Sequence, residues 1–265
     1  MLILNRPPQK PKQSCTVARP LPWDSRFWGF PVAECRLQFF SKPKLRQAFL
    51  WCQQHRIRCL YLFISTQPSR QQRQWAQELG IRFVEQRVLL QRNLLSPIPE
   101  GTTPGVRVAS FSDRKCLCRL AERMHKNTRF FMDLTFPPRK AKTLYSIWVR
   151  EDLKKNRVYV ARPPKNSSLL AGYVTCQRSS LKFGQIGLLG VLPKFQGKGW
   201  GKELLFTALR WFKQQSCTRV LVTTQATNRL ALRLYLSAGF RFYRRDECYH
   251  WWINQPNSAK RPINL

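Results

Sequence analysis

The chain has 265 residues, 43% of them hydrophobic, which is enough apolar material for one large or two modest cores. Its 47 Lys and Arg against 13 Asp and Glu give a net charge of +34, and the excess lies on both sides of residue 104. A field of this sign attracts polyanions, so nucleic acid and nucleotide-linked small molecules are candidate partners. The sequence contains no apolar run of the ~20 residues needed to span a membrane, and no zinc finger or Arg-rich run.

The cysteines and the chain ends indicate the compartment. The nine cysteines include no CxxC pair, and the three histidines lack metal-ligand spacing. The N-terminus lacks the long apolar stretch of a secretory signal, and residues 1–20 and 255–265 are expected to be disordered basic tails. We therefore expect a cytoplasmic protein with reduced thiols and no metal site.

A small α/β unit is predicted over residues 21–95, followed by a Pro- and Gly-rich linker at 96–105. In chain order, the unit is expected to contain an aromatic-rich turn at 21–30, a strand at 32–37, a helix at 44–54, a strand at 59–64, a helix at 69–79 and a strand at 83–90.

A larger unit is predicted over residues 106–254. Its expected strands are 106–109, 157–161, 170–176, 185–191, 220–224, 240–243 and 248–253, and its expected helices are 115–124, 140–153, 203–212 and 228–237. The end of the first unit and the end of the second resemble one another: 75–84 and 234–243 each predict a helix, a Gly stop and a strand. This similarity reflects either ordinary α/β sequence patterns or a first unit that is a degenerate partial copy of the second.

A glycine-rich loop, Gln196-Gly-Lys-Gly-Trp-Gly201, joins the strand at 185–191 to the helix that follows. Backbone N–H groups at a helix N-terminus, with no side chains in the way, form a site for phosphate. Lys198 and Lys202 either add charge to this site or are solvated surface residues. The loop therefore predicts a phosphorylated cofactor.

The loop resembles the acetyl-CoA pyrophosphate loop of the GNAT superfamily of N-acetyltransferases. The segment from Asn228 through Ala231, Tyr235 and Gly239 to Phe240 resembles a second signature of that family, in the right order and spacing. The resemblance covers about 105–254. It implies the acyl-CoA N-acyltransferase fold, with a mixed, largely antiparallel sheet flanked by helices, here preceded by the smaller α/β domain. It implies contacts to acetyl-CoA from Leu189, Val191, Gln196, Gly197, Lys198, Gly199, Trp200, Gly201, Lys202 and Asn228.

The segments 23–29 and 128–130 resemble a two-unit branch of the family that includes bacterial dTDP-fucosamine acetyltransferase. This resemblance implies an amino group on a nucleotide-linked sugar as the acceptor. The aromatic turn at 23–29 alternatively serves only to pack the two units together.

The resemblance assigns Tyr235 as the general acid that protonates the departing CoA thiolate, whose conjugate acid has a pKa of about 8.5. Asn228 is either a cofactor contact or a helix N-cap. Residues 183–195 contain no Asp, Glu or His to act as a general base, and Glu122 and Asp133 are only remote candidates. The missing base favours a small amine that loses its proton more readily than lysine does.

Three functions remain open on these residues. The first is a small-molecule N-acetyltransferase that uses acetyl-CoA. The second is an acetyltransferase for a protein N-terminus or lysine on a ribosomal or nucleic-acid-bound target. The third is a non-catalytic nucleic-acid-binding protein on the same fold. The sequence does not determine the oligomeric state.

Overall fold

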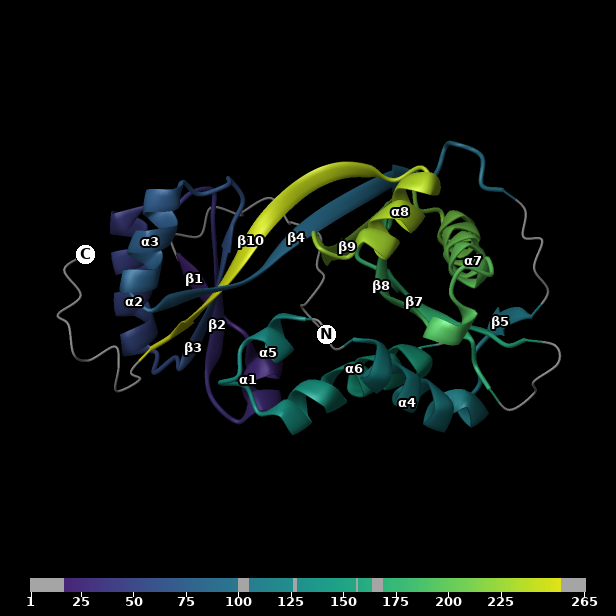
Figure 1. Cartoon of the computed structure of the whole chain (residues 1–265), viewed down its shortest axis with the longest axis horizontal. Coiled ribbons are helices and arrows are strands. Elements are labelled where there is room, and N and C mark those ends of the chain that lie inside the picture. The colour runs from purple at the N-terminus through teal and green to yellow at the C-terminus, as the bar shows by residue number, and fades with distance from the viewer. Residues whose placement is uncertain (1–16, 100–104, 126–127, 156, 164–168, 254–265) are drawn as a thin grey trace.

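The computed structural model describes residues 17–99, 105–125, 128–155, 157–163 and 169–253. The ten strands of this described part form one mixed sheet in the order β1-β2-β3-β10-β4-β9-β8-β7-β6-β5, flanked by helices (Figure 1). Two neighbouring pairs, β2–β3 and β8–β9, are parallel and the others are antiparallel. The expected mixed, largely antiparallel sheet with flanking helices is therefore confirmed.

The elements of the first 99 residues agree closely with the predicted order of strands and helices. They are β1 (Ala18–Pro20), α1 (Pro22–Trp28), β2 (Val32–Leu37), α2 (Lys42–Gln54), β3 (Cys59–Ile64), α3 (Arg70–Glu78) and β4 (Ile81–Asn93). The aromatic segment expected to be a turn is the helix α1, and three residues of the predicted tail form β1. The rest of that tail, residues 1–16, and the predicted tail at 255–265 lie outside the described residues.

The remaining elements are β5 (Val106–Val108), α4 (Arg114–Met124), α5 (Arg129–Met132), α6 (Pro138–Leu153), β6 (Val158–Ala161), β7 (Gly172–Arg178), β8 (Phe183–Val191), α7 (Trp200–Gln214), β9 (Arg219–Gln225), α8 (Arg229–Ser237) and β10 (Arg241–Trp252). One prediction here is wrong, because the two strands expected at 240–243 and 248–253 are the single strand β10. The polar stretch between them stays in the strand because its carboxylates are paired: Asp246 with Arg244 of the same strand at 2.8 Å, and Glu247 with Arg73 of α3 at 2.5 Å.

The two halves of the sheet repeat one connectivity. The series β2-α2-β3-α3-β4 has the same order of elements as β8-α7-β9-α8-β10, and each begins with a parallel pair of strands. The last strand of each series pairs with the other half, since β4 pairs with β9 and β10 pairs with β3. In Figure 1 the strands β4 and β10 form the long arch that joins the two halves. The division of the chain at 96–105, and its origin as a partial copy, stay predictions.

The aromatic helix α1 packs the two halves together, as one of the two interpretations of that segment expects. The Trp28 ring lies 4.5 Å from Phe136 and 5.1 Å from Phe130, measured between ring centroids. Aromatic pairs at these separations stabilise a contact beyond their buried area by about 0.5–1.5 kcal/mol each. The strand β4 belongs to the same sheet, and its pairing with β9 brings it to the cavity described next.

Candidate active site

The strands β8 and β9 separate in the middle of the sheet. Their parallel pairing runs from Phe183 beside Arg219 to Ile186 beside Val222, whereas β8 continues to Val191 and β9 to Gln225. A register shift between β7 and β8 lies at this point, where the backbone N–H of Leu188 donates to the Thr175 hydroxyl at 3.0 Å. A bulge bends its strand and re-aims the residues beyond it. A cavity of about 140 Å³ opens here, and Leu189 lines it.

The glycine-rich loop follows β8 directly and ends at the N-terminus of α7. Gly197 and Gly199 have φ of +74° and +82°, a left-handed conformation that favours glycine. A Cβ atom at either position would meet no atom within 4 Å, so the space above the loop is open. No side chain caps the first turn of α7, where Gly199 is the N-cap residue. The loop therefore offers uncapped amide donors and an open cradle, which fit a pyrophosphate.

The other predicted loop residues divide into exposed and structural ones. Lys198 and Lys202 are exposed, and each can approach a bound anion. The Gln196 side-chain amide donates to the Val191 carbonyl at 2.9 Å, which ties the loop to the end of β8. Trp200 is buried in the core, so only its backbone remains for a ligand.

Tyr235 lies on α8 and lines the same cavity as Leu189. Its side chain is 5% exposed, and burial raises its pKa well above the usual value, so the phenol keeps its proton at neutral pH. Asn228 also lines the cavity, and its side-chain oxygen accepts from the Ala231 N–H at 3.1 Å. The helix-cap interpretation of Asn228 is thus confirmed, and the cap leaves its amide NH₂ for the cavity.

The carboxylate that residues 183–195 lack comes from the first half of the chain. Glu85 on β4 lines the cavity and accepts from the Gln225 amide at 3.3 Å. It is the only carboxylate among the described residues that line this cavity. Glu122 and Asp133 do not line it, and Asp133 instead accepts from His250 and Trp252, each at 2.8 Å. No local signal marks Glu85, because only the pairing of β4 with β9 brings it here.

His125 is a second titratable group in the cavity that the sequence did not single out. Its Nε2 lies 2.7 Å from the Tyr173 hydroxyl, and its ring stacks on Tyr145 with centroids 4.9 Å apart. Burial lowers the pKa of His125 to about 4. The ring is therefore neutral at pH 7 but a weak base.

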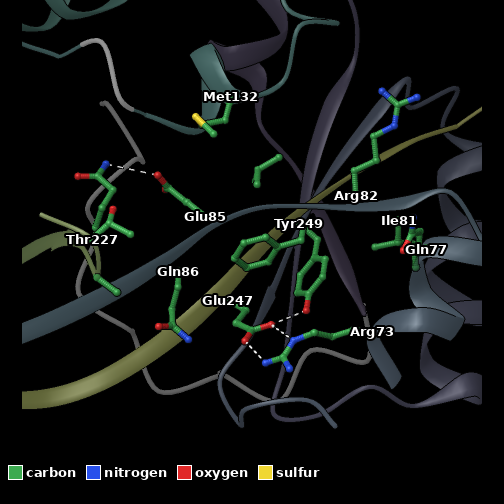
Figure 2. A pocket seen from close by; sticks show the side chains of 14 residues that line it. Arg73, Gln77, Ile81, Arg82, Glu85, Gln86, Met132, Thr227, Glu247 and Tyr249 are labelled. Carbon is green, nitrogen blue, oxygen red and sulfur yellow. Dashed lines mark hydrogen bonds and ion pairs between the residues drawn. The ribbon is translucent and has the colours of Figure 1, made fainter. Parts of the chain in front are cut away.

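A larger cavity of about 970 Å³ adjoins the first, and Glu85 and Gln225 line both. Figure 2 shows Glu85, Met132 and Tyr249 among the side chains around this space, which Phe83 also lines. Arg73 is tied to Glu247 on the far side. The Glu85–Gln225 pair therefore stands where a molecule in the large cavity would meet one in the small cavity.

The surface of the described residues carries few carboxylates. Eight of their twelve Asp and Glu side chains are buried, whereas of their Lys and Arg only Arg92 and Arg129 are. The high net charge is thus concentrated at the surface, where it attracts anionic molecules. Within the described part of the chain, no cluster of three or more His, Cys, Asp or Glu is placed to hold a metal ion. No helix there is long and apolar enough to cross a membrane.

Residues 125–240 match the model of the acetyltransferase (GNAT) family. Over 166 residues the chain is 28% identical to the dTDP-fucosamine acetyltransferase of Escherichia coli, a match that covers 62% of this chain and 68% of that protein. Over 176 residues it is 32% identical to the mycothiol acetyltransferase of Thermomonospora curvata, which covers 62% of this chain and 54% of that protein. Shorter matches to other mycothiol acetyltransferases span only 19–20% of their length.

The fold also matches a solved structure along most of its length. A GCN5-related N-acetyltransferase from Sphaerobacter thermophilus superposes with a TM-score of 0.64 at 18% identity, covering 90% of this chain and 76% of that one. At this identity the likeness shows the fold alone. It extends through both halves of the ten-stranded sheet.

Proposed function

Because residues 125–240 belong to the GNAT acetyltransferase family, we propose that this chain transfers an acetyl group from acetyl-CoA directly to a primary amine of a small molecule. The observation that carries the proposal is a cavity lined by Tyr235 and by the separated end of β8, with the open phosphate cradle directly following that strand. Glu85 adds a carboxylate to the same cavity.

The acetyl-CoA side of the site is assigned to the second half of the chain. Amide N–H groups of the loop at 196–201 and the N-terminus of α7 would bind the pyrophosphate. The edge of β8 around Leu189, where pairing with β9 has ended, supports binding of the pantetheine arm. A backbone N–H aimed at the thioester oxygen there would be worth roughly 3–4 kcal/mol to the transition state.

The transfer forms a C–N bond and breaks a C–S bond. The amine nitrogen attacks the thioester carbonyl carbon, Glu85 takes a proton from the attacking amine, and the CoA sulfur leaves as a thiolate. Tyr235 donates its proton to that sulfur, and proton exchange with solvent restores both side chains. The raised pKa of Tyr235 keeps the proton in place until negative charge develops on the leaving sulfur.

The large cavity favours a small molecule over a protein chain as the acceptor. Its volume of about 970 Å³ is of the size of ligand pockets, and it opens onto Glu85. The relative from Escherichia coli is named for dTDP-fucosamine, and the one from Thermomonospora curvata is named for mycothiol. An amine of a nucleotide-linked sugar is accordingly the first acceptor to test.

The test is acetyl-CoA-dependent thiol release measured over a panel of amines that includes nucleotide-linked amino sugars, glucosamine conjugates and lysine peptides. We expect release with at least one small amine, and acetylated product by mass spectrometry. Release with lysine or N-terminal peptides alone would replace the small-molecule assignment by a protein acetyltransferase. No release with any amine, together with tight salt-sensitive binding to nucleic acid, would support the binding-protein alternative.

A further inference from the structure

One buried guanidinium lies at the reaction cavity. Arg129 begins α5, is 3% exposed and lines the same cavity as Glu85 and Tyr235. Its Cζ lies 4.3 Å from the centroid of the Tyr61 ring and 4.6 Å from that of Phe130. These rings hold the side chain in place and attract its charge, but they accept few of its five N–H donors.

Arg129 has no ion-pair partner in the part of the chain that the structure describes. Among the described residues, no carboxylate lies within 4.0 Å of its guanidinium, and its one hydrogen bond runs from Nη1 to the Cys248 sulfur at 3.5 Å. Burial raises the pKa of the Cys248 thiol, so the sulfur stays neutral and does not offset the charge. Arg92, also buried, differs because it donates to the carbonyl oxygens of Ala238 and Pro97.

A second arginine of the cavity is almost as poorly paired. Arg87 on β4 has a side chain 11% exposed, and its buried Nε has no hydrogen-bond partner. Glu85 lies 4.0 Å from it, beyond hydrogen-bonding distance. Arg87 and Arg129 therefore present two cations to one small cavity that holds a single carboxylate.

The nearby carboxylates behind the cavity do not neutralise this pair. Glu34 is bound by Arg19 at 2.5 Å and by Arg36 at 3.4 Å. Asp24 lies beyond ion-pair distance of Arg129, and although burial raises its pKa to about 6 it is mostly ionised at pH 7, so it offsets the Arg129 charge only at longer range. Burial opposes the charge of Arg129, but neighbouring groups that include Glu85 hold its pKa above the usual value, so the guanidinium stays charged. A bound anion would accept from the N–H donors of the guanidinium that have no acceptor among the described residues.

We propose that Arg129, together with Arg87, forms an anion-binding subsite that holds a carboxylate or phosphate group of the amine acceptor. The inference rests on the proposed function, because it takes this cavity as the place where the acceptor meets acetyl-CoA. The pyrophosphate of CoA is assigned to the loop at 196–201. That loop does not line the cavity that Arg87 and Arg129 line, so the two anion sites are separate. The planar fork of a guanidinium matches both kinds of oxyanion, so the shared chemistry is an anionic oxygen pair.

The acceptor is then an amine that also bears an anionic group close to the reacting nitrogen. Glu85 faces the amine and the two arginines face the anion, so the cavity distinguishes the two ends of such a molecule. A neutral amine of the same size would leave the arginines unpaired and bind less well.

The first experiment measures binding without turnover. Protein saturated with CoA, so that the loop is occupied, is heated with acetate, methylphosphonate or the uncharged acetamide. We expect acetate or methylphosphonate, at a few times its dissociation constant, to raise the Tm by about 2–4 °C, whereas acetamide does not. A larger Tm shift with acetate identifies the bound group as a carboxylate, and a larger shift with methylphosphonate identifies it as a phosphate. Equal effects of all three compounds would overturn the inference.

Matched variants assign the effect to Arg129. Arg129→Met should abolish the Tm shift, and Arg129→Lys should keep part of it, since a charge remains without the fork. Arg36→Met is the control, because Arg36 also lies 4.3 Å from the Phe63 ring but does not line the reaction cavity. A shift retained in folded Arg129→Met, or lost equally in Arg36→Met, would contradict the proposed subsite.

An acceptor pair tests the same subsite in turnover. Wild-type protein should acetylate β-alanine with kcat/KM at least tenfold above that for β-alaninamide, and Arg129→Met should bring the ratio near one. Thiol release with no preference for the carboxylate would refute the subsite while leaving the acetyltransferase intact. Absence of thiol release with every amine would refute the function, and the Tm experiment would still test the subsite.

Discussion

Replacing Glu85 by Gln removes the only carboxylate that the described residues bring into the reaction cavity, with little change of shape. A positioned general base contributes typically 10²–10⁴-fold, or about 3–5 kcal/mol of transition-state stabilisation. The replacement also takes from Arg87 its nearest carboxylate, at 4.0 Å. We therefore expect kcat with the best acceptor to fall by about 10²–10⁴-fold at pH 7, with the KM for acetyl-CoA nearly unchanged.

The pH dependence separates loss of a base from general damage. Without Glu85 the amine must lose its proton to solvent, and the neutral fraction of an amine rises tenfold per pH unit below its pKa. The rate of Glu85→Gln should therefore climb about tenfold per pH unit, more steeply than that of the wild type, in a continuous thiol-release assay. Glu78→Gln is the matched control, since Glu78 lies exposed on α3.

A Glu85→Gln variant within about threefold of wild-type kcat would refute Glu85 as the base. In that case His125→Gln becomes the decisive variant, because the His125 ring also lines the cavity and is neutral at pH 7. A loss confined to KM for the amine would show instead that Glu85 binds the acceptor without taking its proton.

Three further outcomes are expected. Tyr235→Phe should lower kcat by about 10²-fold while the dissociation constant of CoA, measured by calorimetry, changes little; unchanged turnover would exclude the phenol as the acid. Gly199→Asp should weaken CoA binding at least tenfold more than Gly199→Asn, since both side chains tolerate a positive φ and only one is charged; equal losses would argue against a phosphate cradle. Burial lowers the pKa of His250 to about 4, so the unfolded chain binds more protons between pH 6.5 and 4 and the protein should lose stability as the pH falls through this range. His250→Gln should make that part of the stability curve less steep in thermal unfolding, and His125, whose pKa is also about 4, should account for slope that remains. An equal change on replacing the exposed His55 by Gln would contradict the assignment.

The loop, α7 and α8 were predictable because their signals are local. Glycines at 197 and 199 adopt the positive φ that favours this residue, and the helix that follows has the expected apolar period. Asn228 caps α8 as its residue type predicts, and Tyr235 faces the cavity from that helix. These features depend on residues within about one turn of one another, so a single sequence contains enough information to predict them.

The partners across the cavity were not predictable, because long-range strand pairing decides them. Glu85 precedes Tyr235 by 150 positions, and β4 reaches the cavity only since it pairs with β9 rather than with its own half. The single strand β10 was missed because side-chain pairing stabilises its polar middle. Arg73 and Arg244 neutralise the carboxylates there.

From the sequence by itself, the glycine-rich loop predicted a phosphate cradle because backbone conformation depends on neighbouring residues, whereas the candidate acid and the mixed sheet came from the resemblance to a known family. Only the tertiary structure decided which carboxylate lies opposite Tyr235, and that Arg129 is buried there without a counter-ion. Charge pairing and burial are properties of groups brought together in space, and the exchange of β4 and β10 between the halves of the sheet is what brings them together here.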